Sequence, residues 1–248
     1  MSYSKPQIIQ LECVDSTNNY AMGLIDGNKA QHGMTVTAVS QTNGKGQRGR
    51  VWVDAPGNSL SMSIILVPQH ALAEQFLFNA SVAVAIANVL RKLDAALHVQ
   101  VKWPNDIIVN DKKAGGVLIE NVLRGSLWAN SIVGFGLNVN QAHFPPELPF
   151  ATSLRICCGS TFDITDLAEA IRNEILEMTE TVKNEVQIMQ AFNNYLYKRG
   201  IAQLFSDKDG SWSANILQAQ PDGTLQVQLK DGSIKNYVHG EAIWEYGS

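Results

Sequence analysis

The sequence predicts an α+β protein whose main sheet contains antiparallel strand pairs and is followed by a small all-β unit. Three features support this fold class. Strand-like runs follow one another between residues 99 and 140 with only short turns between them, as in hairpins. Two long segments, 71–93 and 163–182, carry apolar residues at helical spacing. After Gly200 this spacing disappears, and short strand-like runs are separated by Asp-Gly turns.

The first predicted elements are a strand at 8–13 and a helix that begins after the polar run 15–19. Ser16 is a suitable N-cap for this helix. A helix N-terminus also presents free N–H groups to a polar ligand. Capping alone would explain one polar residue but not Ser16, Thr17 and Asn18 together, so both interpretations stay open. Two β-rich runs, 34–40 and 60–67, then flank a glycine-rich segment.

The helix predicted at 71–93 has small and apolar residues well around its axis, so it should lie deep against the sheet. Strands are predicted at 99–103, 107–109 and 128–133, and the run 113–120 leads into another. Helices follow at 163–182 and 187–198, and Gly200 is a good helix stop. We therefore predict one domain at 1–199 and a second at 200–248.

The composition excludes several function classes. The chain has 248 residues, 45% of them hydrophobic, and a net charge of −4. A protein that neutralised nucleic-acid phosphates should carry a basic excess, so DNA or RNA binding is not expected. The three cysteines form neither a disulfide framework nor a metal-ligand spacing. The N-terminus lacks an apolar signal segment and the longest apolar run is 82–87, so we expect a soluble, cytoplasmic protein.

The glycine-rich segment is Q-T-N-G-K-G-Q-R-G-R-V-W, residues 41–52. Glycines let backbone N–H groups approach a ligand, and runs of such groups bind anions. Lysine and arginine side chains add charge-assisted hydrogen bonds, and an indole can stack on a ring. The segment therefore predicts a loop that closes over a phosphate-bearing, nucleotide-like ligand.

Two familiar phosphate-binding patterns do not fit this loop. Residues 44–49 match the dinucleotide pattern G-x-G-x-x-G, but no helix opens at the last glycine and no acidic residue follows at the required distance. The P-loop ending G-K-[ST] is absent. A solvated turn between two strands remains open on this loop alone.

Five motifs occur in a known order: S-T-N at 16–18, the glycine loop, K-W-P-N-D at 102–106, K-A-G-G-V-L at 113–118 and G-F-G-L-N-V-N at 134–140. From about Asp15 to the C-terminus, the chain closely resembles the biotin–protein ligases, also called biotin–[acetyl-CoA-carboxylase] ligases. The larger bacterial members carry an N-terminal helix-turn-helix repressor domain. Here Asp15 is already at the first motif, so the resemblance implies the short class without that domain.

The resemblance implies a mixed sheet flanked by helices, related to class II aminoacyl-tRNA synthetases, and a C-terminal SH3-like barrel. It implies that biotin is activated by ATP as biotinyl-5′-AMP and then transferred to a lysine of a biotin carboxyl carrier protein. Mg²⁺ would accompany ATP, with no tightly bound prosthetic group, no DNA and no membrane as partners. The protein would be a monomer or a homodimer.

The resemblance also implies site residues. The biotin end would comprise Ser16, Thr17, Asn18, Gln41, Gly44, Lys45, Gly46, Gln47, Lys113, Gly115 and Gly116. The nucleotide end would comprise Gln47, Arg48, Arg50, Trp52, Lys102, Asn105, Asp106 and Asn138. Lys113, Lys45 and Arg48 are the expected catalytic cations, because preorganised charge around the α-phosphate stabilises both transition states. Asp106 is the expected carboxylate near Mg²⁺.

One departure from the family pattern concerns the loop, where many members have G-R-G-R-x-G-R. Lys45 keeps the charge but cannot form a bidentate fork, and Gln47 loses the charge. Two other functions stay open. A lipoate–protein ligase shares this fold and an adenylate mechanism, and a non-catalytic biotin or nucleotide sensor could keep the same pocket.

Overall fold

The computed structural model describes residues 7–53, 55–180 and 184–245. Seven strands form one sheet in the order β1-β2-β3-β7-β6-β5-β4. Only β1 and β2 pair in parallel, and every other neighbouring pair is antiparallel. The predicted α+β fold with a mixed sheet flanked by helices is confirmed. The strands are β1 Ile8–Val14, β2 Thr35–Gln41, β3 Ser59–Leu66, β4 Val99–Lys102, β5 Asp106–Val109, β6 Lys112–Arg124 and β7 Leu127–Asn138.

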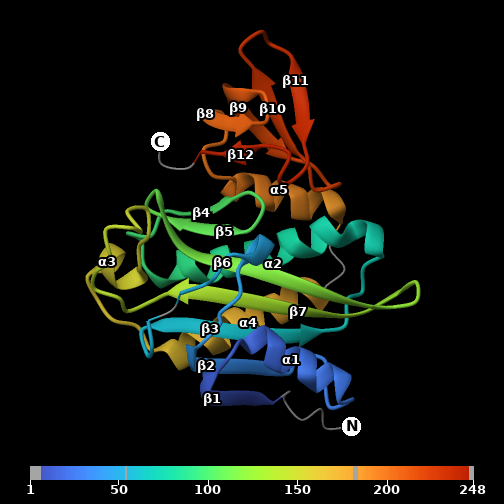
Figure 1. Cartoon of the computed structure of the whole chain (residues 1–248), viewed down its shortest axis with the longest axis vertical. Helices are drawn as coiled ribbons and strands as arrows, with labels where there is room; N and C mark the ends of the chain where they lie inside the picture. The colour runs from blue at the N-terminus through green and yellow to red at the C-terminus, as the bar shows by residue number, and fades with distance from the viewer. Residues whose placement is uncertain (1–6, 54, 181–183, 246–248) are drawn as a thin grey trace.

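Helices cover both faces of this sheet (Figure 1). Neighbouring residues of a strand point to opposite faces, which Ile64 and Ile65 of β3 illustrate. Ile65 packs in a cluster with α1, whereas Ile64 belongs to the main core with α2 and α4. The helices are α1 Thr17–Asp26, α2 Gln75–Leu93, α3 Leu154–Cys158, α4 Ile164–Glu180 and α5 Glu185–Tyr195. The short α3 was not predicted, and Val182, predicted for the fourth helix, lies outside the described residues.

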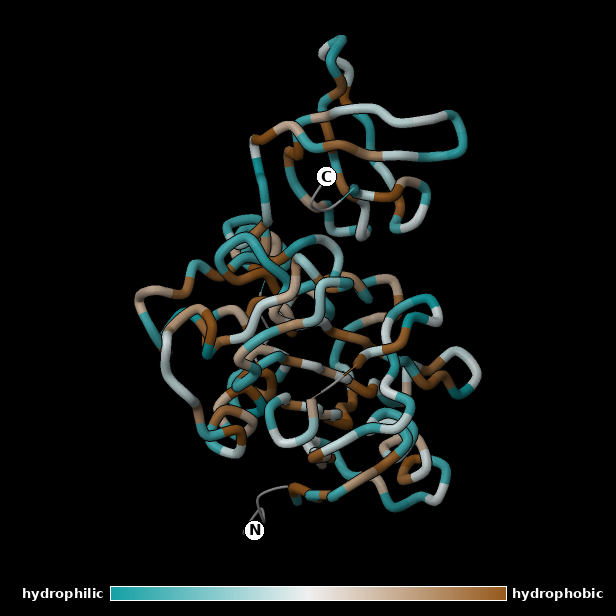
Figure 2. The backbone as a smooth tube through the Cα atoms, turned by 60° about the vertical axis from the view of Figure 1, so that its left-hand side comes forward, coloured by the Kyte–Doolittle hydropathy of each residue, from teal (hydrophilic) through white to brown (hydrophobic). Residues whose placement is uncertain are grey.

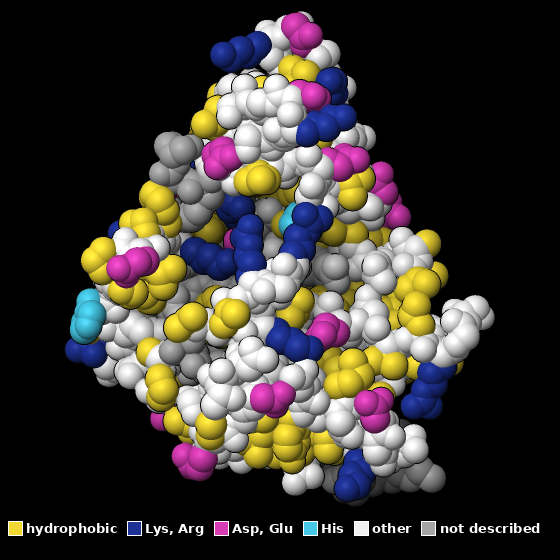
Figure 3. All heavy atoms as spheres, viewed as in Figure 1, with side chains coloured by type: hydrophobic (Ala, Val, Ile, Leu, Met, Phe, Trp, Pro, Cys, Tyr) yellow, Lys and Arg dark blue, Asp and Glu magenta, His cyan; other side chains and the backbone are white. Residues whose placement is uncertain are grey.

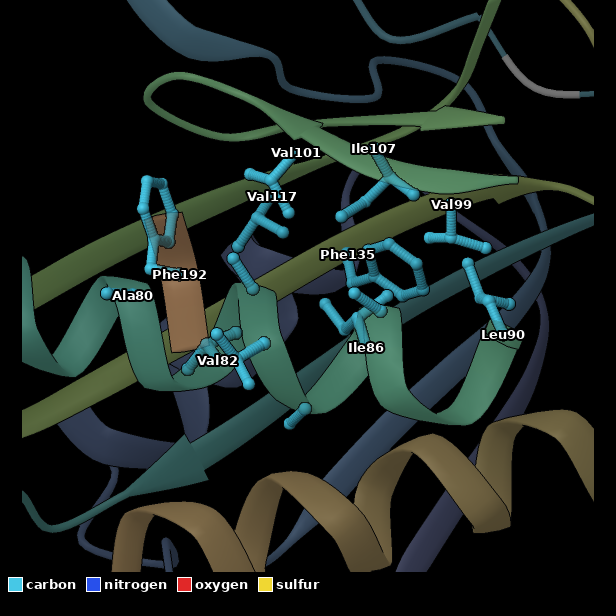
Figure 4. Close-up of a cluster of buried hydrophobic side chains, with 14 of the residues drawn as sticks. Ala80, Val82, Ile86, Leu90, Val99, Val101, Ile107, Val117, Phe135 and Phe192 are labelled. Atoms are coloured by element: carbon cyan, nitrogen blue, oxygen red, sulfur yellow. The ribbon is translucent and has the colours of Figure 1, made fainter. Parts of the chain in front are cut away.

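The helix α2 is the centre of the core, as its all-round apolar pattern predicts. Its side chains Ile86 and Leu90 point toward Phe135 and Val99 of the sheet (Figure 4). The segment Leu72–Leu93 is long and apolar enough to cross a bilayer, yet 72% of its most apolar window is buried inside the protein. Such burial is what a core helix requires, so this segment carries no argument for a membrane span.

A second sheet follows Gly200 and forms a lobe that projects from the larger one (Figure 2). Its five strands pair antiparallel in the order β11-β10-β9-β8-β12. Within the described chain the edge strands β11 and β12 do not pair, so the sheet is open and the SH3-like barrel stays a prediction. The strands are β8 Ala202–Asp207, β9 Gly210–Ala219, β10 Leu225–Leu229, β11 Ile234–Tyr237 and β12 Ile243–Trp244.

Specific contacts hold the two lobes together. The indole N–H of Trp103 donates to the carbonyl of Gly223 at 3.1 Å. Asn193 of α5 exchanges two hydrogen bonds with the backbone of Ala219, at 3.0 and 2.7 Å. Since a buried amide that satisfies both backbone groups is costly to break, these hydrogen bonds stabilise the contact between the lobes. The division at residues 199 and 200 remains a prediction.

Candidate active site between the two sheets

A cavity of about 250 Å³ opens between the large sheet and the C-terminal lobe. It is lined by the N-terminus of α1, the glycine loop, the connection between β4 and β5, the middle of β6 and β7, and the C-terminal sheet. In the space-filling view, Lys and Arg side chains gather around a hollow below the C-terminal lobe (Figure 3). A ligand in this hollow would therefore meet several cations.

One end of the cavity is a buried polar network around the start of α1. The backbone N–H of Thr17 donates to Oε1 of Gln41 at 2.8 Å. Oγ of Ser63 lies 2.7 Å from Oγ1 of Thr17 and 2.6 Å from Oδ1 of Asn18. Ser16 occupies the N-cap position but makes no side-chain capping bond, although it is only 1% exposed. Capping therefore does not account for this serine, which favours the ligand-binding interpretation.

The glycine loop is folded back on itself as a short hairpin. Gly46 N–H donates to the carbonyl of Arg50 at 2.7 Å, and Trp52 N–H donates to the carbonyl of Gly44 at 2.9 Å. Gln47–Gly49 form a 3₁₀ turn in which Arg48 has φ 56° and ψ 39°. A left-handed arginine is strained, so neighbouring contacts must hold it there.

Trp52 closes the loop against β7. A methyl group on Gly136 would overlap the Trp52 indole, so only glycine lets this ring approach the strand. Gly134 likewise leaves room for the side chain of Asn18. The glycines of G-F-G thus make space for two side chains that line the cavity. The sequence motif contained both glycines, but their role required knowing what lies across the sheet.

Lys113 and Asp106 form an ion pair inside the cavity. The ammonium Nζ of Lys113 lies 2.7 Å from Oδ1 of Asp106. The backbone of Lys113 is fixed by its N–H, which donates to the carbonyl of Phe150, and by its carbonyl, which accepts from Thr152. Gly116 borders the pair, where an added methyl would lie 3.5 Å from Oδ1 of Asp106. The sequence-predicted catalytic lysine and metal carboxylate are therefore direct neighbours.

Lys102 lies at the nucleotide end predicted from the sequence. Its ammonium is 4.9 Å from the centre of the Trp244 ring, a cation–π contact. Burial lowers the pKa of Lys102, an effect that the charge of Asp106 opposes and the charges of Lys113 and Arg50 reinforce. The cavity thus concentrates positive charge that an anionic ligand would neutralise.

Three predicted residues do not line the cavity: Gly44, Gly115 and Asn138. A methyl on Gly115 would lie 2.6 Å from the carbonyl of Gly136, so that glycine serves the neighbouring strand rather than a ligand. Asn138 donates to the carbonyl of Thr152 at 3.1 Å and accepts from Gln141. Asn105 does line the cavity, but its side-chain amide donates to the carbonyl of Val117 at 2.7 Å. The remaining predicted residues are brought together here.

Glu120 does not line the cavity itself but contacts two residues that do, and sequence reasoning missed this role. Its Oε1 lies 3.1 Å from Nζ of Lys45, and its Oε2 accepts from the amide of Asn18 at 2.7 Å. Glu120 therefore joins the glycine loop to the polar network at α1. Glu120 lies two residues after the K-A-G-G-V-L motif. Because side chains alternate along a strand, it is expected on the same face as Leu118 and Gly116.

The C-terminal lobe also contributes side chains that no motif predicted. Tyr237, His239 and Trp244 line the cavity. The imidazole of His239 meets the Trp103 ring edge-on, with centroids 5.5 Å apart. Burial lowers the pKa of His239, and the nearby charges of Arg48 and Lys102 lower it further. The sequence offered no signal here beyond the turns that shape the sheet.

A Mg²⁺ ion would find one carboxylate. Asp106 is the single acidic residue among the described residues that line the cavity. No group of three His, Cys, Asp or Glu side chains able to hold a metal occurs in the described part of the chain. This donor set fits Mg²⁺ bound mainly by nucleotide phosphates and water, which is its usual mode.

Comparisons with known proteins show which family and which solved structures the chain is similar to. Residues 10–138 match the biotin/lipoate A/B protein ligase family. The chain is 31% identical over 240 residues to the bifunctional ligase/repressor BirA of Bacillus spizizenii, covering 93% of this chain and 72% of that protein. It is 37% identical over 133 residues to the biotin–[acetyl-CoA-carboxylase] ligase of Paracoccus denitrificans, covering 53% of each. The biotin protein ligase of Aquifex aeolicus, solved with biotin and ATP, has a TM-score of 0.79 at 25% identity and covers 95% of this chain and 97% of its own.

Proposed function

The chain belongs to the biotin/lipoate A/B protein ligase family, and we propose that it is a biotin–protein ligase. It activates biotin with ATP and transfers the biotinyl group to a lysine of a biotin carboxyl carrier protein. The observation that carries this assignment is the placement of Lys113 in one cavity with the glycine-loop cations and the polar network of α1. The similar Aquifex aeolicus ligase binds biotin and ATP, as its structure records.

In the first half-reaction, a carboxylate oxygen of biotin attacks the α-phosphorus of ATP. A new P–O bond forms, the bond to the bridging oxygen breaks, and pyrophosphate leaves with the electron pair. Negative charge accumulates around the α-phosphate, and Lys113, Lys45 and Arg48 are the cations that would stabilise it. Because Asp106 orients Lys113 and the carbonyl of His239 orients Arg48 before the reaction, these two side chains need little reorganisation when that charge develops.

In the second half-reaction, the carrier lysine attacks the carbonyl carbon of the mixed anhydride as a neutral amine. An amide bond forms, AMP leaves as the phosphate anion, and the amine nitrogen loses a proton. Lys113 would again stabilise the negative charge that develops on the oxygens between the carbonyl and the phosphate. Ser16, Thr17, Asn18 and Gln41 would hold the biotin end, with Arg50, Trp52, Lys102 and Asp106 at the nucleotide end.

Mg²⁺ bound with ATP would neutralise phosphate charge, with Asp106 as its protein ligand. Each carboxylate has two oxygens, so Asp106 can keep its bond to Lys113 while it contacts a hydrated ion.

The cytoplasmic location and the oligomeric state also stay predictions.

The family includes lipoate ligases, so the substrate must be tested directly. We expect exchange of labelled pyrophosphate into ATP that depends on biotin and not on lipoate. Lipoate-dependent exchange would favour the lipoate ligase. Tight binding of biotin with no exchange would favour a sensor. Incorporation of labelled biotin into a purified carrier domain, and its loss when the acceptor lysine is replaced by arginine, tests the second step.

A further inference from the structure

Arg48 of the glycine loop is seated on the C-terminal lobe. Its Nη2 donates to the backbone carbonyl of His239 at 2.5 Å, across 191 residues of sequence. The end of the guanidinium fork also abuts Gly240, where an added methyl group would overlap both terminal nitrogens and the carbon between them. The Arg48 side chain is thus held by a backbone acceptor and fits only because residue 240 has no side chain.

Gly240 is suited to this contact for two reasons. Its φ of 94° is in the left-handed region that side-chain-bearing residues rarely adopt. Its Cα faces Arg48 directly, so any side chain would displace the guanidinium. Gly232 of the same sheet has a similar φ of 85° but open space where a methyl group would lie. The two glycines therefore share a backbone conformation and differ in what they face.

The turn 238–241, which contacts Arg48, does not depend on this arginine for its own shape. Val238 N–H donates to Oε2 of Glu241 at 2.8 Å, and Glu241 N–H donates to the carbonyl of Val238 at 3.0 Å. These reciprocal bonds close the turn that carries His239 and Gly240. The His239 ring packs against Trp103, which fixes the turn on the larger lobe. A preformed turn can position a flexible side chain, whereas a mobile one could not.

We infer that the turn 238–241 positions Arg48 for the phosphates of ATP, with Gly240 as the positioning residue. Arg48 lines the same cavity as two further cations, Arg50 and Lys102. The hydrogen bond to the carbonyl of His239 uses one of the five N–H donors of the guanidinium, which leaves other donors for a phosphate. Restricting the rotamers of Arg48 in advance removes part of the ordering cost of binding ATP.

The C-terminal lobe thereby takes part in the first half-reaction through the glycine loop. It does so without supplying a charged side chain of its own at this contact. The inference rests on the proposed ligase function, because it concerns how that site binds ATP. It also explains how Arg48 is kept in its left-handed conformation, since the turn holds the side chain from outside the loop.

The test compares four proteins with the wild type: Gly240→Ala, Gly232→Ala, Arg48→Ala and the double variant Arg48→Ala/Gly240→Ala. Biotin-dependent pyrophosphate exchange gives kcat and the KM for ATP, and thermal melting reports stability. Gly240→Ala is expected to raise the KM for ATP by about tenfold or more, since small misplacements of a positioning group are costly. Gly232→Ala imposes the same backbone strain without the clash and should change that KM less than about twofold.

The double variant separates positioning from a general structural effect. Once Arg48 is alanine the clash is gone, so the double variant should have nearly the same KM for ATP as Arg48→Ala alone. Gly240→Ala should melt at a temperature no lower than that of Gly232→Ala. Equal effects of the two glycine variants, or additive effects of Gly240→Ala and Arg48→Ala, would overturn the inference. A wild-type protein without biotin-dependent exchange would overturn the proposed function, and this inference with it.

Discussion

The ammonium of Lys113 lies 2.7 Å from a carboxylate oxygen of Asp106, on the neighbouring strand of the large sheet. The pair faces the cavity that also receives the glycine loop. Each partner limits the rotamers of the other, so the lysine is directed before any ligand arrives. In a site that stabilises charge, such prior orientation lowers the reorganisation needed in the transition state.

Lys113→Ala is expected to slow biotinyl-AMP formation by about a hundredfold or more, an effect of the size found for oxyanion-hole donors. Affinity for biotin should fall as well, because the substrate carboxylate is already an anion. Rapid-quench measurement of adenylate gives the rate. The matched control is Lys112→Ala, which removes an exposed lysine one position earlier on the same strand. Near-normal turnover of Lys113→Ala would remove this lysine from the mechanism.

Asp106→Asn removes the partner of Lys113 and the expected Mg²⁺ carboxylate together. Adenylate formation should slow by about 10- to 100-fold, as is typical when a group that orients a ligand or metal is lost. The Mg²⁺ concentration for half-maximal rate should also rise. Titration of Mg²⁺ at fixed ATP measures both, with Asp209→Asn in an exposed turn as the control. An unchanged Mg²⁺ requirement would limit Asp106 to holding Lys113.

Glu120→Gln should loosen the glycine loop in the absence of ligand. Its ion pair with Lys45 is partly exposed, and such pairs contribute about 0.5–1 kcal/mol. The amide hydrogens of residues 44–50 should therefore exchange about two- to fivefold faster. Hydrogen exchange followed by mass spectrometry measures this, with Glu177→Gln on the exposed face of α4 as the control. Identical exchange in both variants would show that Glu120 does not hold the loop.

Gln47 lines the cavity where many members of the family have a cation. Gln47→Arg is expected to slow release of biotinyl-AMP by about tenfold or more, because a charged hydrogen bond contributes about 1.5–3 kcal/mol. Stopped-flow dissociation measures the rate. Gln190→Arg adds the same charge on the exposed face of α5 and should leave release unchanged. A faster or equal off-rate for Gln47→Arg would mean that residue 47 does not face the phosphate.

The lowered pKa of His239 makes a prediction about acid stability. Burial, then the charges of Arg48, Lys102 and Arg50, disfavour the imidazolium, whereas Asp106 favours it. Between the folded pKa and the usual 6.5 the unfolded chain binds more protons, so stability falls as the pH drops below 6.5.

His239→Gln should therefore lose less thermal stability between pH 7 and pH 5.5 than the wild type. Thermal melting at the two pH values measures the difference. His143→Gln, in an exposed loop, serves as the control and should follow the wild type. If His239→Gln declines as steeply as the wild type, the protonation of His239 does not contribute to acid sensitivity.

Local patterns in the sequence predicted most of the elements. Helical spacing of apolar residues identified α2 and α4, and β-rich runs bounded by turn residues identified the strands of both sheets. The short α3 escaped because five residues carry no periodic signal. Barrel closure, implied by the resemblance, depends on pairing between β11 and β12, which no local pattern encodes, and the described strands form an open sheet.

The candidate site divides in the same way. The glycine loop, K-W-P-N-D and K-A-G-G-V-L could be read from the sequence because each motif combines turn-forming residues with the charges that the chemistry needs. The contacts that hold these groups in place could not be read from the sequence. Glu120 meets Lys45 across 75 residues, and His239 meets Arg48 across 191. Periodicity and turn chemistry act over a few residues, whereas these contacts depend on sheet order and on how the C-terminal lobe packs over the cavity. The sequence by itself determined which groups this protein has for activating a carboxylate, and the tertiary structure alone decided which side chains hold those groups in place.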